Sequence, residues 1–406
     1  MRFLPVQLIL GLALCTFLPF IGSGLDTVNQ IFYTGGYANL FISALLVGSS
    51  IITLHSIQRF PGITSSTYII PVIFFWFLLI LLLIKLSNTS YSFYYYNFSS
   101  FLLLIYLFFI DIINRKHATY TFAYIPVGRA KQIPEQIPTV NWLPLHSPYL
   151  DAEVNGIVTD LHSDDLTDDW ERFITDKTLK GTPVYHYRNI RESLTGRVRI
   201  NHMYENDLGS LIPSPNYMFL KYFLDVLLIL ASLPFTVLIG IITAIAIKLE
   251  DGGKVFYIQP RVGYRGEIMQ VYKFRSMKEK SKEVVTTTDD DRITKVGKFI
   301  RKTRIDELPQ FINVIKGEMS LIGPRAEFID FAVELEKEVP FFNYRHIVKP
   351  GISGWAQVNQ GYATGAEETK VKIEYDFYYI KHISFSLDLL IFFKTIHTMV
   401  TGFGAR

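Results

Sequence analysis

The sequence predicts a membrane protein of the α+β class, built from three parts. Residues 1–117 contain four apolar runs, residues 118–214 alternate strand and helix patterns, and residues 215–406 are mostly helical in pattern. Apolar residues make up 49% of the 406, and the mean hydropathy of +0.24 is high for a water-soluble protein. We therefore expect an N-terminal four-helix transmembrane bundle, a Rossmann-like α/β middle domain and a mostly helical C-terminal domain with one further membrane segment.

The predicted bundle rests on the lengths of its apolar runs. A helix that spans a bilayer needs about 20 apolar residues. The runs lie at Phe3–Ile21, Ala38–Leu54, Thr67–Ile84 and Phe101–Ile113. The last is short unless the tyrosines around residues 94–97 lie at the membrane interface, where tyrosine is enriched. We prefer a span to a signal peptide for the first run, because no clear small-residue cleavage site follows it.

The basic residues between the runs predict the topology. If all four runs cross, Arg2, Arg59, Arg115 and Lys116 fall on one side and only Lys85 falls on the other. The positive-inside rule then places the N-terminus and everything after residue 116 in the cytoplasm. No charged residue lies in the middle of a run, which disfavours a channel or transporter.

The middle part reads as a β-α-β unit. Val154–Asp160 and Thr182–Tyr187 have strand patterns, and Leu161–Lys180 between them has a helical pattern. Such a unit suits a Rossmann-like sheet. The Gly-x-Gly-x-x-Gly phosphate loop is absent from the sequence, so we expect a structural or regulatory role rather than nucleotide binding. The single cysteine, Cys15, excludes an intramolecular disulfide and a cysteine-based zinc site.

The apolar run Val226–Ile247 is long enough to cross the membrane a fifth time. Crossing would place the region from Lys254 to Lys316, with fifteen Lys/Arg against eight Asp/Glu, outside the cell. The positive-inside bias opposes that arrangement. Pro234 lies near the middle of the run, where a proline removes a helical hydrogen bond and can bend the helix. Crossing and re-entry are therefore both open on these residues alone.

Two adjacent carboxylates, Asp306 and Glu307, are the strongest chemical signal. They precede Pro309, which the first turn of a helix tolerates. The pattern predicts a helix from Glu307 that stops at Gly317, with Asp306 as its N-cap. An isolated aspartate there is usually only a cap, but basic residues flank this pair on both sides. An acidic pair among cations suits a metal-bound phosphate and a carboxylate nucleophile, and carboxylate oxygens are ligands that Mg²⁺ accepts.

From about Lys221 to the C-terminus the chain resembles the bacterial sugar transferase family, the polyprenyl-phosphate phosphoglycosyl transferases. It is similar to the large form, which adds N-terminal transmembrane helices. Six motifs carry the resemblance, in the family's order: Gln259–Gly263 (QPRVG), Tyr272–Met277 (YKFRSM), Asp291–Thr294 (DRIT), Asp306–Gln310 (DELPQ), Met319–Arg325 (MSLIGPR) and Lys349–Trp355 (KPGISGW). Two departures are Ala326 after Gly-Pro-Arg, where the family has proline, and Leu233 between Ser232 and Pro234.

The resemblance implies an enzyme that transfers a sugar-1-phosphate from a UDP-sugar to undecaprenyl phosphate. This is the first membrane step of exopolysaccharide, capsule or O-antigen synthesis. It implies Asp306 as the nucleophile of an aspartyl-phosphosugar intermediate and Glu307 as a second ligand of Mg²⁺. It also implies a bacterial inner membrane location, a catalytic domain facing the cytoplasm, and a re-entrant helix-break-helix at about 222–248, which we favour over a fifth crossing.

Five cations are expected near the pair, because arginine binds phosphate bidentately and lysine acts as a point charge. They are Arg301, Lys273, Arg275, Arg261 and Arg325. Asp376 is a weaker candidate than the acidic pair. We expect the lipid bilayer, but no nucleic acid, as a further partner.

Several alternatives stay open on the sequence. A non-catalytic membrane scaffold would fit if the acidic pair were lost, but it is intact. Trp355 suits either the core or the site, and Ile383–Val400 suits either the membrane surface or the protein core. The identity of the sugar and a homodimeric state are also open.

Overall fold

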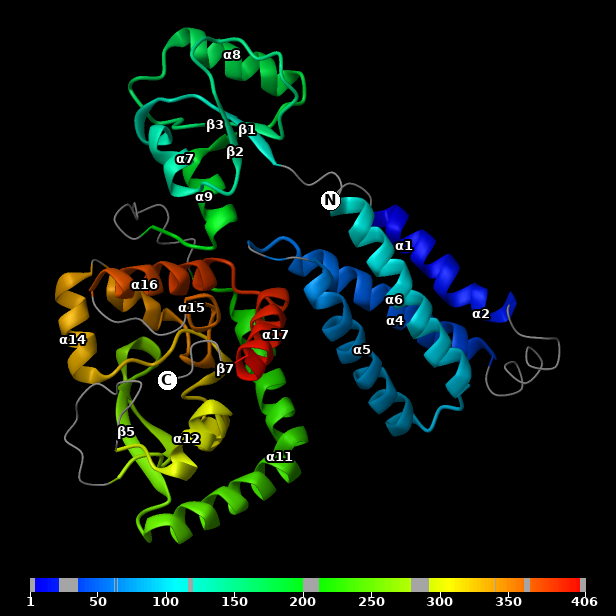
Figure 1. The fold of residues 1–406 in the computed structure, drawn as a ribbon, viewed down its shortest axis with the longest axis vertical. Helices are drawn as coiled ribbons and strands as arrows, with labels where there is room; N and C mark the ends of the chain where they lie inside the picture. The colour runs from blue at the N-terminus through cyan, green and yellow to red at the C-terminus, as the bar shows by residue number, and fades with distance from the viewer. Residues whose placement is uncertain are drawn as a thin grey trace. The chain divides into compact units, whose positions relative to one another are not determined.

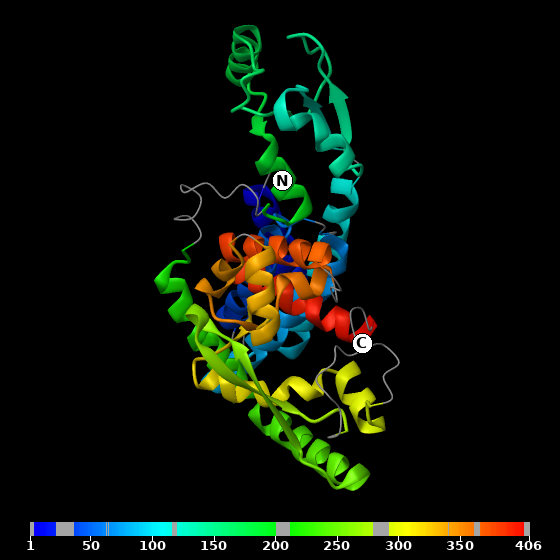
Figure 2. The same ribbon diagram turned by 90° about the vertical axis from the view of Figure 1, so that its left-hand side faces the viewer.

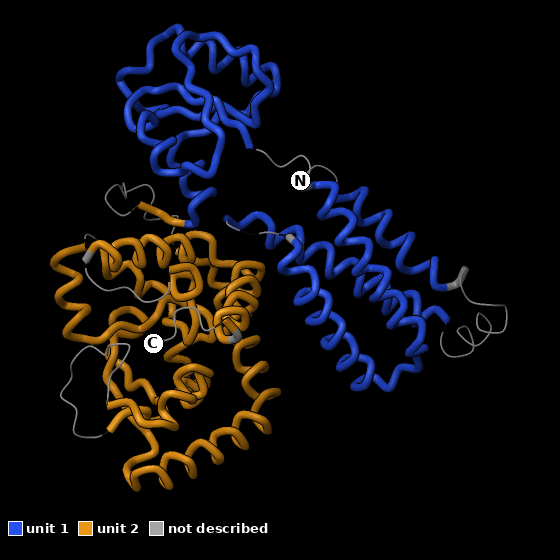
Figure 3. Tube along the Cα trace, in the orientation of Figure 1, with its two compact units in different colours: residues 1–196 blue, residues 197–406 orange. Residues whose placement is uncertain are grey.

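The structure is a computed structural model that describes residues 4–21, 36–61, 63, 65–115, 120–199, 212–278, 292–339, 341–360 and 366–401. The chain forms two compact units, Met1–Gly196 and Arg197–Arg406, which are drawn in different colours in Figure 3.

The four apolar runs are helical, as predicted. The first comprises α1 (Leu4–Leu12), a π-helical turn η1 (Ala13–Phe17) and α2 (Leu18–Ile21), and the others are α4 (Gly36–Ile57), α5 (Ser65–Ser87) and α6 (Phe93–Arg115). The last three are long and apolar enough to cross a membrane, whereas the first, at Leu4–Phe17, is shorter. Helix α6 begins eight residues before the predicted run, so its tyrosines extend the helix to spanning length.

The π-helical turn η1 loosens the regular bonding of the first helix, and α6 compensates for this. The Ser99 hydroxyl donates to the Cys15 carbonyl at 2.7 Å, and the Tyr95 hydroxyl donates to the Thr16 carbonyl. Backbone carbonyls in an apolar environment need such partners, because no water satisfies them there. These contacts therefore join the first and last helices of the group.

The second half of unit 1 is a four-stranded, fully parallel sheet. Its strands are β1 (Thr121–Tyr124), β2 (Asn141–Pro144), β3 (Gly156–Thr159) and β4 (Val184–His186), in the order β2-β1-β3-β4. Helix α8 (Asp168–Leu179) connects β3 to β4, which confirms the predicted β-α-β unit. Shorter helices η2 (Gly128–Gln132), α7 (Ile133–Gln136) and α9 (Tyr187–Thr195) complete the layers around the sheet.

Unit 2 begins with one long helix, α11 (Pro215–Asp251), of 37 residues. A straight α-helix of that length would be about 55 Å long, which exceeds the apolar thickness of a bilayer. Its axis turns part-way along (Figure 1). The predicted helix-break-helix is therefore wrong in its local form, because the helix is continuous through Pro234 and bends instead of breaking.

Both arms of α11 pack on the same compact unit. Ile229 in the first arm is buried with Val271 and Val314, and Ile247 in the second arm is buried with Phe274 and Ile300. Between the two contacts the helix presents exposed apolar side chains, including Phe235 (72% exposed). The helix is thus fixed at both ends and bare in its middle.

The body of unit 2 surrounds a long antiparallel pair, β5 (Phe256–Val262) with β6 (Ile268–Phe274), which runs toward the end of α11 (Figure 2). A short parallel pair joins β7 (Ser320–Ile322) to β8 (Gly351–Ser353). The remaining elements are η5 (Tyr264–Gly266), α12 (Lys295–Lys302), η6 (Ile305–Gln310), α13 (Phe311–Ile315), α14 (Ile329–Glu338), η7 (Phe342–Ile347), α15 (Trp355–Asn359), α16 (Ala366–Lys381) and α17 (Phe385–Thr401).

Two features left open by the sequence have a definite place in this fold. Trp355 is 1% exposed and stacks on Tyr378, so it is a core residue. Helix α17 packs Leu387, Leu390 and Ile391 into the core, while its other face, which includes Phe392, is exposed. The helix therefore packs on the protein through one face and leaves an apolar face uncovered.

Candidate active site

The acidic pair lies in the 3₁₀ helix η6, which continues into α13. Arg304 before it has a left-handed backbone, with φ +56°, and takes the N-cap position. The prediction that Asp306 is the N-cap and that the helix starts at Glu307 is therefore wrong. Arginine is an unusual residue at positive φ, so no local sequence pattern predicts this turn. The predicted end is confirmed, because Gly317, at φ +79°, follows the last turn.

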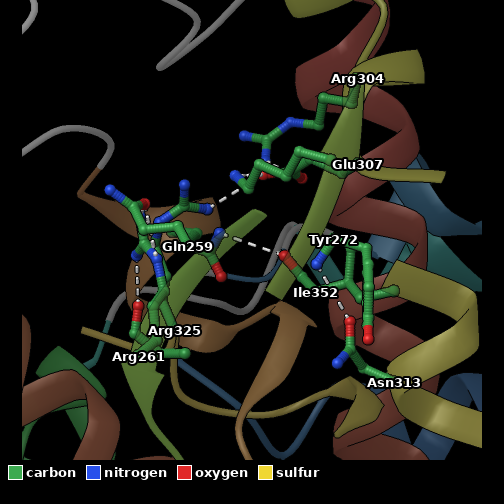
Figure 4. A network of polar contacts seen from close by, with 11 residues as sticks. Gln259, Arg261, Tyr272, Arg304, Glu307, Asn313, Arg325 and Ile352 are labelled. Carbon is green, nitrogen blue, oxygen red and sulfur yellow. Dashed lines mark hydrogen bonds and ion pairs between the residues drawn. The ribbon is translucent and has the colours of Figure 1, made fainter. Parts of the chain in front are cut away.

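Glu307 is the centre of a cluster of cations (Figure 4). Its Oε1 lies 3.2 Å from Lys273 Nζ and 3.2 Å from an Arg325 guanidinium nitrogen, and its Oε2 lies 3.5 Å from Arg304. Lys273 comes from β6 and Arg325 from the loop after β7. Burial by itself raises the pKa of Glu307, but Lys273, Arg325 and Arg304 together outweigh it and lower that pKa to about 2. Glu307 is therefore ionised throughout the physiological range.

Asp306 has the opposite shift. Burial and the adjacent charge of Glu307 raise its pKa to about 6, against the opposing effects of Lys273, Arg325 and Arg301. Arg301 lowers the pKa of Asp306, but its effect is smaller than those of Lys273 and Arg325. At pH 7 the ionised form still exceeds the neutral form by about ten to one. Asp306 is thus a partly exposed carboxylate that is more basic than an ordinary aspartate.

A cleft beside the pair gathers three of the five predicted cations. Arg261, Lys273 and Arg325 line it together with Gln310 and other side chains. Arg261 is held by hydrogen bonds to Gln259 Oε1, at 3.0 and 3.3 Å, and to a backbone carbonyl, at 2.6 Å. Such a fixed guanidinium is prepared to bind phosphate without further ordering.

The other two predicted cations differ from these three. Arg301 lies on α12 and influences Asp306 through its charge. Arg275 is instead paired with Asp251 at the C-terminal end of α11. A Cβ atom at Gly253 would lie 2.0 Å from the Arg275 guanidinium, so the side chain fills the space that this glycine leaves. The structure therefore places Arg275 as an anchor of the membrane helix rather than beside the acidic pair.

A buried ionic network supports the cleft from behind. Arg345 donates to the Arg325 carbonyl at 2.9 Å and pairs with Asp376 at 2.6 Å and Glu327 at 3.2 Å. Glu327 also pairs with Lys372. Asp376 thus lies behind the site instead of in it. No sequence pattern predicts the network of Arg345, Glu327 and Lys372, because isolated charged residues carry no local signal of their partners.

The oxygen atoms of the acidic pair are a reasonable donor set for Mg²⁺. Glu307 Oε2 is buried and accepts no hydrogen bond. No hydrogen-bond donor therefore competes with a metal ion for this oxygen. Over the described ranges no group of three or more His, Cys, Asp or Glu side chains could hold a metal ion. Two carboxylates alone suit Mg²⁺, which binds through one or two of them together with substrate phosphates.

Comparisons with known proteins identify the family of this chain. The family model for bacterial sugar transferases matches residues 216–402. A UDP-N-acetylgalactosamine-undecaprenyl-phosphate N-acetylgalactosaminephosphotransferase of Aeromonas hydrophila is 43% identical over 370 residues, which cover 90% of this chain and 86% of the relative. The chain belongs to the bacterial sugar transferase family. The resemblance inferred from the six motifs is thereby confirmed.

Two further relatives align with less than half of this sugar transferase. A UDP-glucose:undecaprenyl-phosphate glucose-1-phosphate transferase of Escherichia coli K12 is 43% identical over 158 residues, 38% of this chain and 34% of that protein. An uncharacterized sugar transferase of Bacillus subtilis is 39% identical over 191 residues, 47% of this chain but 91% of its own length. The Bacillus relative is therefore little longer than the segment that aligns with this chain.

Proposed function

We propose that this sugar transferase moves a sugar-1-phosphate from a UDP-sugar to undecaprenyl phosphate and so begins a surface polysaccharide. The observation that carries the proposal is the Asp306–Glu307 pair at a cleft lined by Arg261, Lys273 and Arg325. A carboxylate of raised basicity among fixed cations suits attack on a diphosphate. The names of the Aeromonas and Escherichia relatives supply the donor and acceptor classes.

The first half of the proposed reaction forms a covalent intermediate. A carboxylate oxygen of Asp306 attacks the phosphorus that carries the sugar, and the bond from that phosphorus to the oxygen of UMP breaks. UMP leaves with the bonding electrons, and Asp306 then carries an acyl phosphate. Lys273, Arg261 and Arg325 stabilise the negative charge on the phosphates during the transfer.

The second half releases the product. An oxygen of undecaprenyl phosphate attacks the same phosphorus, the bond to Asp306 breaks, and the carboxylate is regenerated. The product is a sugar joined to the lipid through a diphosphate. Because each half uses the same nucleophile and the first product leaves before the acceptor reacts, ping-pong kinetics follow.

Mg²⁺ is part of the proposal. Asp306 and Glu307 would hold it, and the bound ion would neutralise phosphate charge and orient the donor. Glu307 already balances Lys273, Arg325 and Arg304, so its role is to keep the cations in place as well as to contribute an oxygen.

The membrane arrangement follows from α11. Both of its arms pack on one compact unit, and its exposed apolar middle needs a lipid environment. We infer that the helix enters and leaves the bilayer on the same face, and that this face is cytoplasmic because donor nucleotides are cytosolic. The N-terminal apolar helices would span a bacterial inner membrane. The parallel sheet would form a Rossmann-like domain over 118–214, with the transferase domain over 215–406.

The test is release of UMP by purified full-length protein with Mg²⁺, undecaprenyl phosphate and a panel of UDP-sugars that includes UDP-N-acetylgalactosamine and UDP-glucose. Asp306→Asn should lower turnover by at least about 1,000-fold, roughly 4 kcal/mol in the barrier, because an amide is a poor nucleophile. Asp330→Asn removes an exposed carboxylate of α14 and should leave turnover unchanged.

The intermediate has its own test in the same preparation. With a sugar-labelled donor and no lipid acceptor, label should remain on denatured wild-type protein and be absent from Asp306→Asn. An Asn variant that keeps more than about a tenth of the rate, a loss of under about 1.4 kcal/mol, would exclude Asp306 as the nucleophile. Absence of label together with ternary-complex kinetics would indicate direct displacement by the lipid.

A further inference from the structure

Two lysines on unit 2, Lys316 and Lys349, are held on aromatic rings. Lys316 Nζ lies 4.9 Å from the centre of the Tyr272 ring and 3.2 Å from its hydroxyl oxygen. Lys349 Nζ lies 4.3 Å from the centre of the Tyr222 ring. A ring face attracts an ammonium group without neutralising it, so both positive charges stay available.

The two lysines belong to one small area. The Tyr222 hydroxyl, on α11, donates to the Ile315 carbonyl at 2.9 Å and so ties the membrane helix to the end of α13. A Cβ atom at Gly317 would lie 3.5 Å from Lys349 Nζ and 3.8 Å from the Tyr222 hydroxyl. Lys349 therefore lies over the residue that follows Lys316.

The acidic groups that face these lysines are already engaged. Glu318 acts on Lys316 through its charge, but its Oε2 accepts a hydrogen bond from Asn313 at 2.7 Å. Asp225 acts on Lys349 through its charge, but its Oδ2 accepts from the Ser320 hydroxyl at 2.6 Å. Across the part of the chain that the structure describes, no carboxylate pairs with either lysine within 4.0 Å. Neither lysine is therefore neutralised by a close carboxylate.

Exposed apolar side chains surround the lysines. Phe219 and Phe223 flank Tyr222 on α11 and are 76% and 57% exposed, and Ile312 and Ile315 on α13 are 46% and 43% exposed. This apolar surface continues into the bare face of α11, which is long and apolar enough to enter a membrane. Lysines beside such a surface lie where lipid head groups begin.

We propose that Lys316 and Lys349 together bind the phosphate of an anionic phospholipid head group, and that this contact sets how the catalytic unit rests on the membrane. The proposal relies on the membrane position of α11 proposed above. Lys316 is nine residues from Glu307, at the far end of the η6–α13 segment. Neither lysine is among the residues that line the cleft beside the acidic pair.

The test places a reporter beside the lysines in full-length protein. Ile315→Cys in a Cys15→Ser background is labelled with a fluorophore and reconstituted in phosphatidylcholine nanodiscs. Nitroxide-labelled phosphatidylglycerol should quench it at a lower mole fraction than nitroxide-labelled phosphatidylcholine. The double variant Lys316→Gln with Lys349→Gln should lose this preference. Each lysine is expected to account for about a fivefold difference in the mole fraction needed for quenching. The control pair Lys180→Gln with Lys337→Gln removes two exposed charges elsewhere and should retain it.

Four results would overturn the proposal: equal quenching by the two lipids, a preference that persists in the Lys316/Lys349 double variant, equally effective competition by inorganic phosphate, or a preference for undecaprenyl phosphate over phosphatidylglycerol. UMP release is measured in the same discs. If the protein releases UMP but shows no preference for phosphatidylglycerol, the lipid site at Lys316 and Lys349 is excluded and the proposed function stands. If the protein prefers phosphatidylglycerol but releases no UMP, only the proposed function is excluded.

Discussion

At the scale of single residues, the site separates two adjacent carboxylates into different roles. Glu307 lies within 3.5 Å of three cationic side chains, and its pKa is lowered, whereas Asp306 beside it has a raised pKa. The charge on Glu307 is one cause of the raised pKa of Asp306. Glu307 thus holds the cations, and Asp306, the proposed nucleophile, is left as the more basic carboxylate.

The raised pKa of Asp306 predicts that the catalytic rate falls on the acidic side of the pH profile. The nucleophile must be ionised, so kcat/KM for the donor should be level above about pH 6 and fall about tenfold per pH unit below it. Arg301→Gln removes a charge that lowers this pKa, so this fall should move to higher pH. Lys298→Gln, an exposed lysine on the same helix, should leave it in place. A fall unaffected by Arg301→Gln would show that another group controls it.

The ionic network behind the cleft predicts a stability effect. Arg345→Met should lower the unfolding free energy by about 3–5 kcal/mol, because it leaves Glu327 and Asp376 buried without a full set of partners. The loss is measured as a lower melting temperature in detergent. Lys370→Met breaks an exposed pair with Glu367 and should cost about 1 kcal/mol or less. Equal melting temperatures for the two variants would contradict a structural role for Arg345.

At the scale of elements, helix α11 determines how unit 2 can meet a membrane. Its polar ends are bound into unit 2: Lys221 pairs with Asp388 at 2.6 Å near the start, and Arg275 pairs with Asp251 at the end. The Lys221–Asp388 pair is buried, whereas Asp251 in the second pair is exposed. The two pairs nevertheless hold both ends of the helix against the protein. Both ends of the helix are thus held on unit 2, and its exposed apolar middle is the part that fits the re-entry proposed above.

This geometry predicts the accessibility of both ends of α11. Single cysteines at Asn216 and Lys254, both exposed, are introduced in a Cys15→Ser background. Both should react with a membrane-impermeant thiol reagent only from the cytoplasmic side. Reaction of the Lys254 position from the periplasmic side would establish a fifth crossing and separate the site from its cytosolic donor.

The bend itself predicts an effect of Pro234. Pro234→Leu restores a helical hydrogen bond and should straighten the helix, which shifts the segment towards crossing and lowers turnover. The same two cysteines report the topology, and UMP release reports the activity. Unchanged topology and turnover would show that packing at Ile229 and Ile247, rather than the proline, sets the bend.

The elements also show what sequence patterns can predict. Apolar length and strand–helix alternation predicted the N-terminal helices and the β3-α8-β4 unit, because these depend on local periodicity. Strands β1 and β2 were missed, since four-residue strands give too short a pattern. The left-handed turn at Arg304 and the partner of Arg275 depend on tertiary contacts. Motifs therefore located the acidic pair but not the conformation that presents it.

At the scale of the whole molecule, the acidic pair, the cleft and the network behind it all lie in unit 2. The Bacillus relative aligns over 91% of its own length with less than half of this chain. The cations that surround Glu307 also belong to unit 2. Unit 1 would then add membrane attachment and the functions of its parallel sheet, not chemistry.

This division predicts that residues 197–406 are catalytic alone. Purified in detergent, that segment should release UMP from its donor within about threefold of the full chain, a difference of under about 1 kcal/mol in the barrier. Asp306→Asn in the segment serves as the inactive control. The melting temperature checks that the segment is folded, because α11 must still pack through Ile229 and Ile247. A folded segment that has lost more than about 100-fold would show that unit 1 completes the site, and the assignment of all the chemistry to unit 2 would fail.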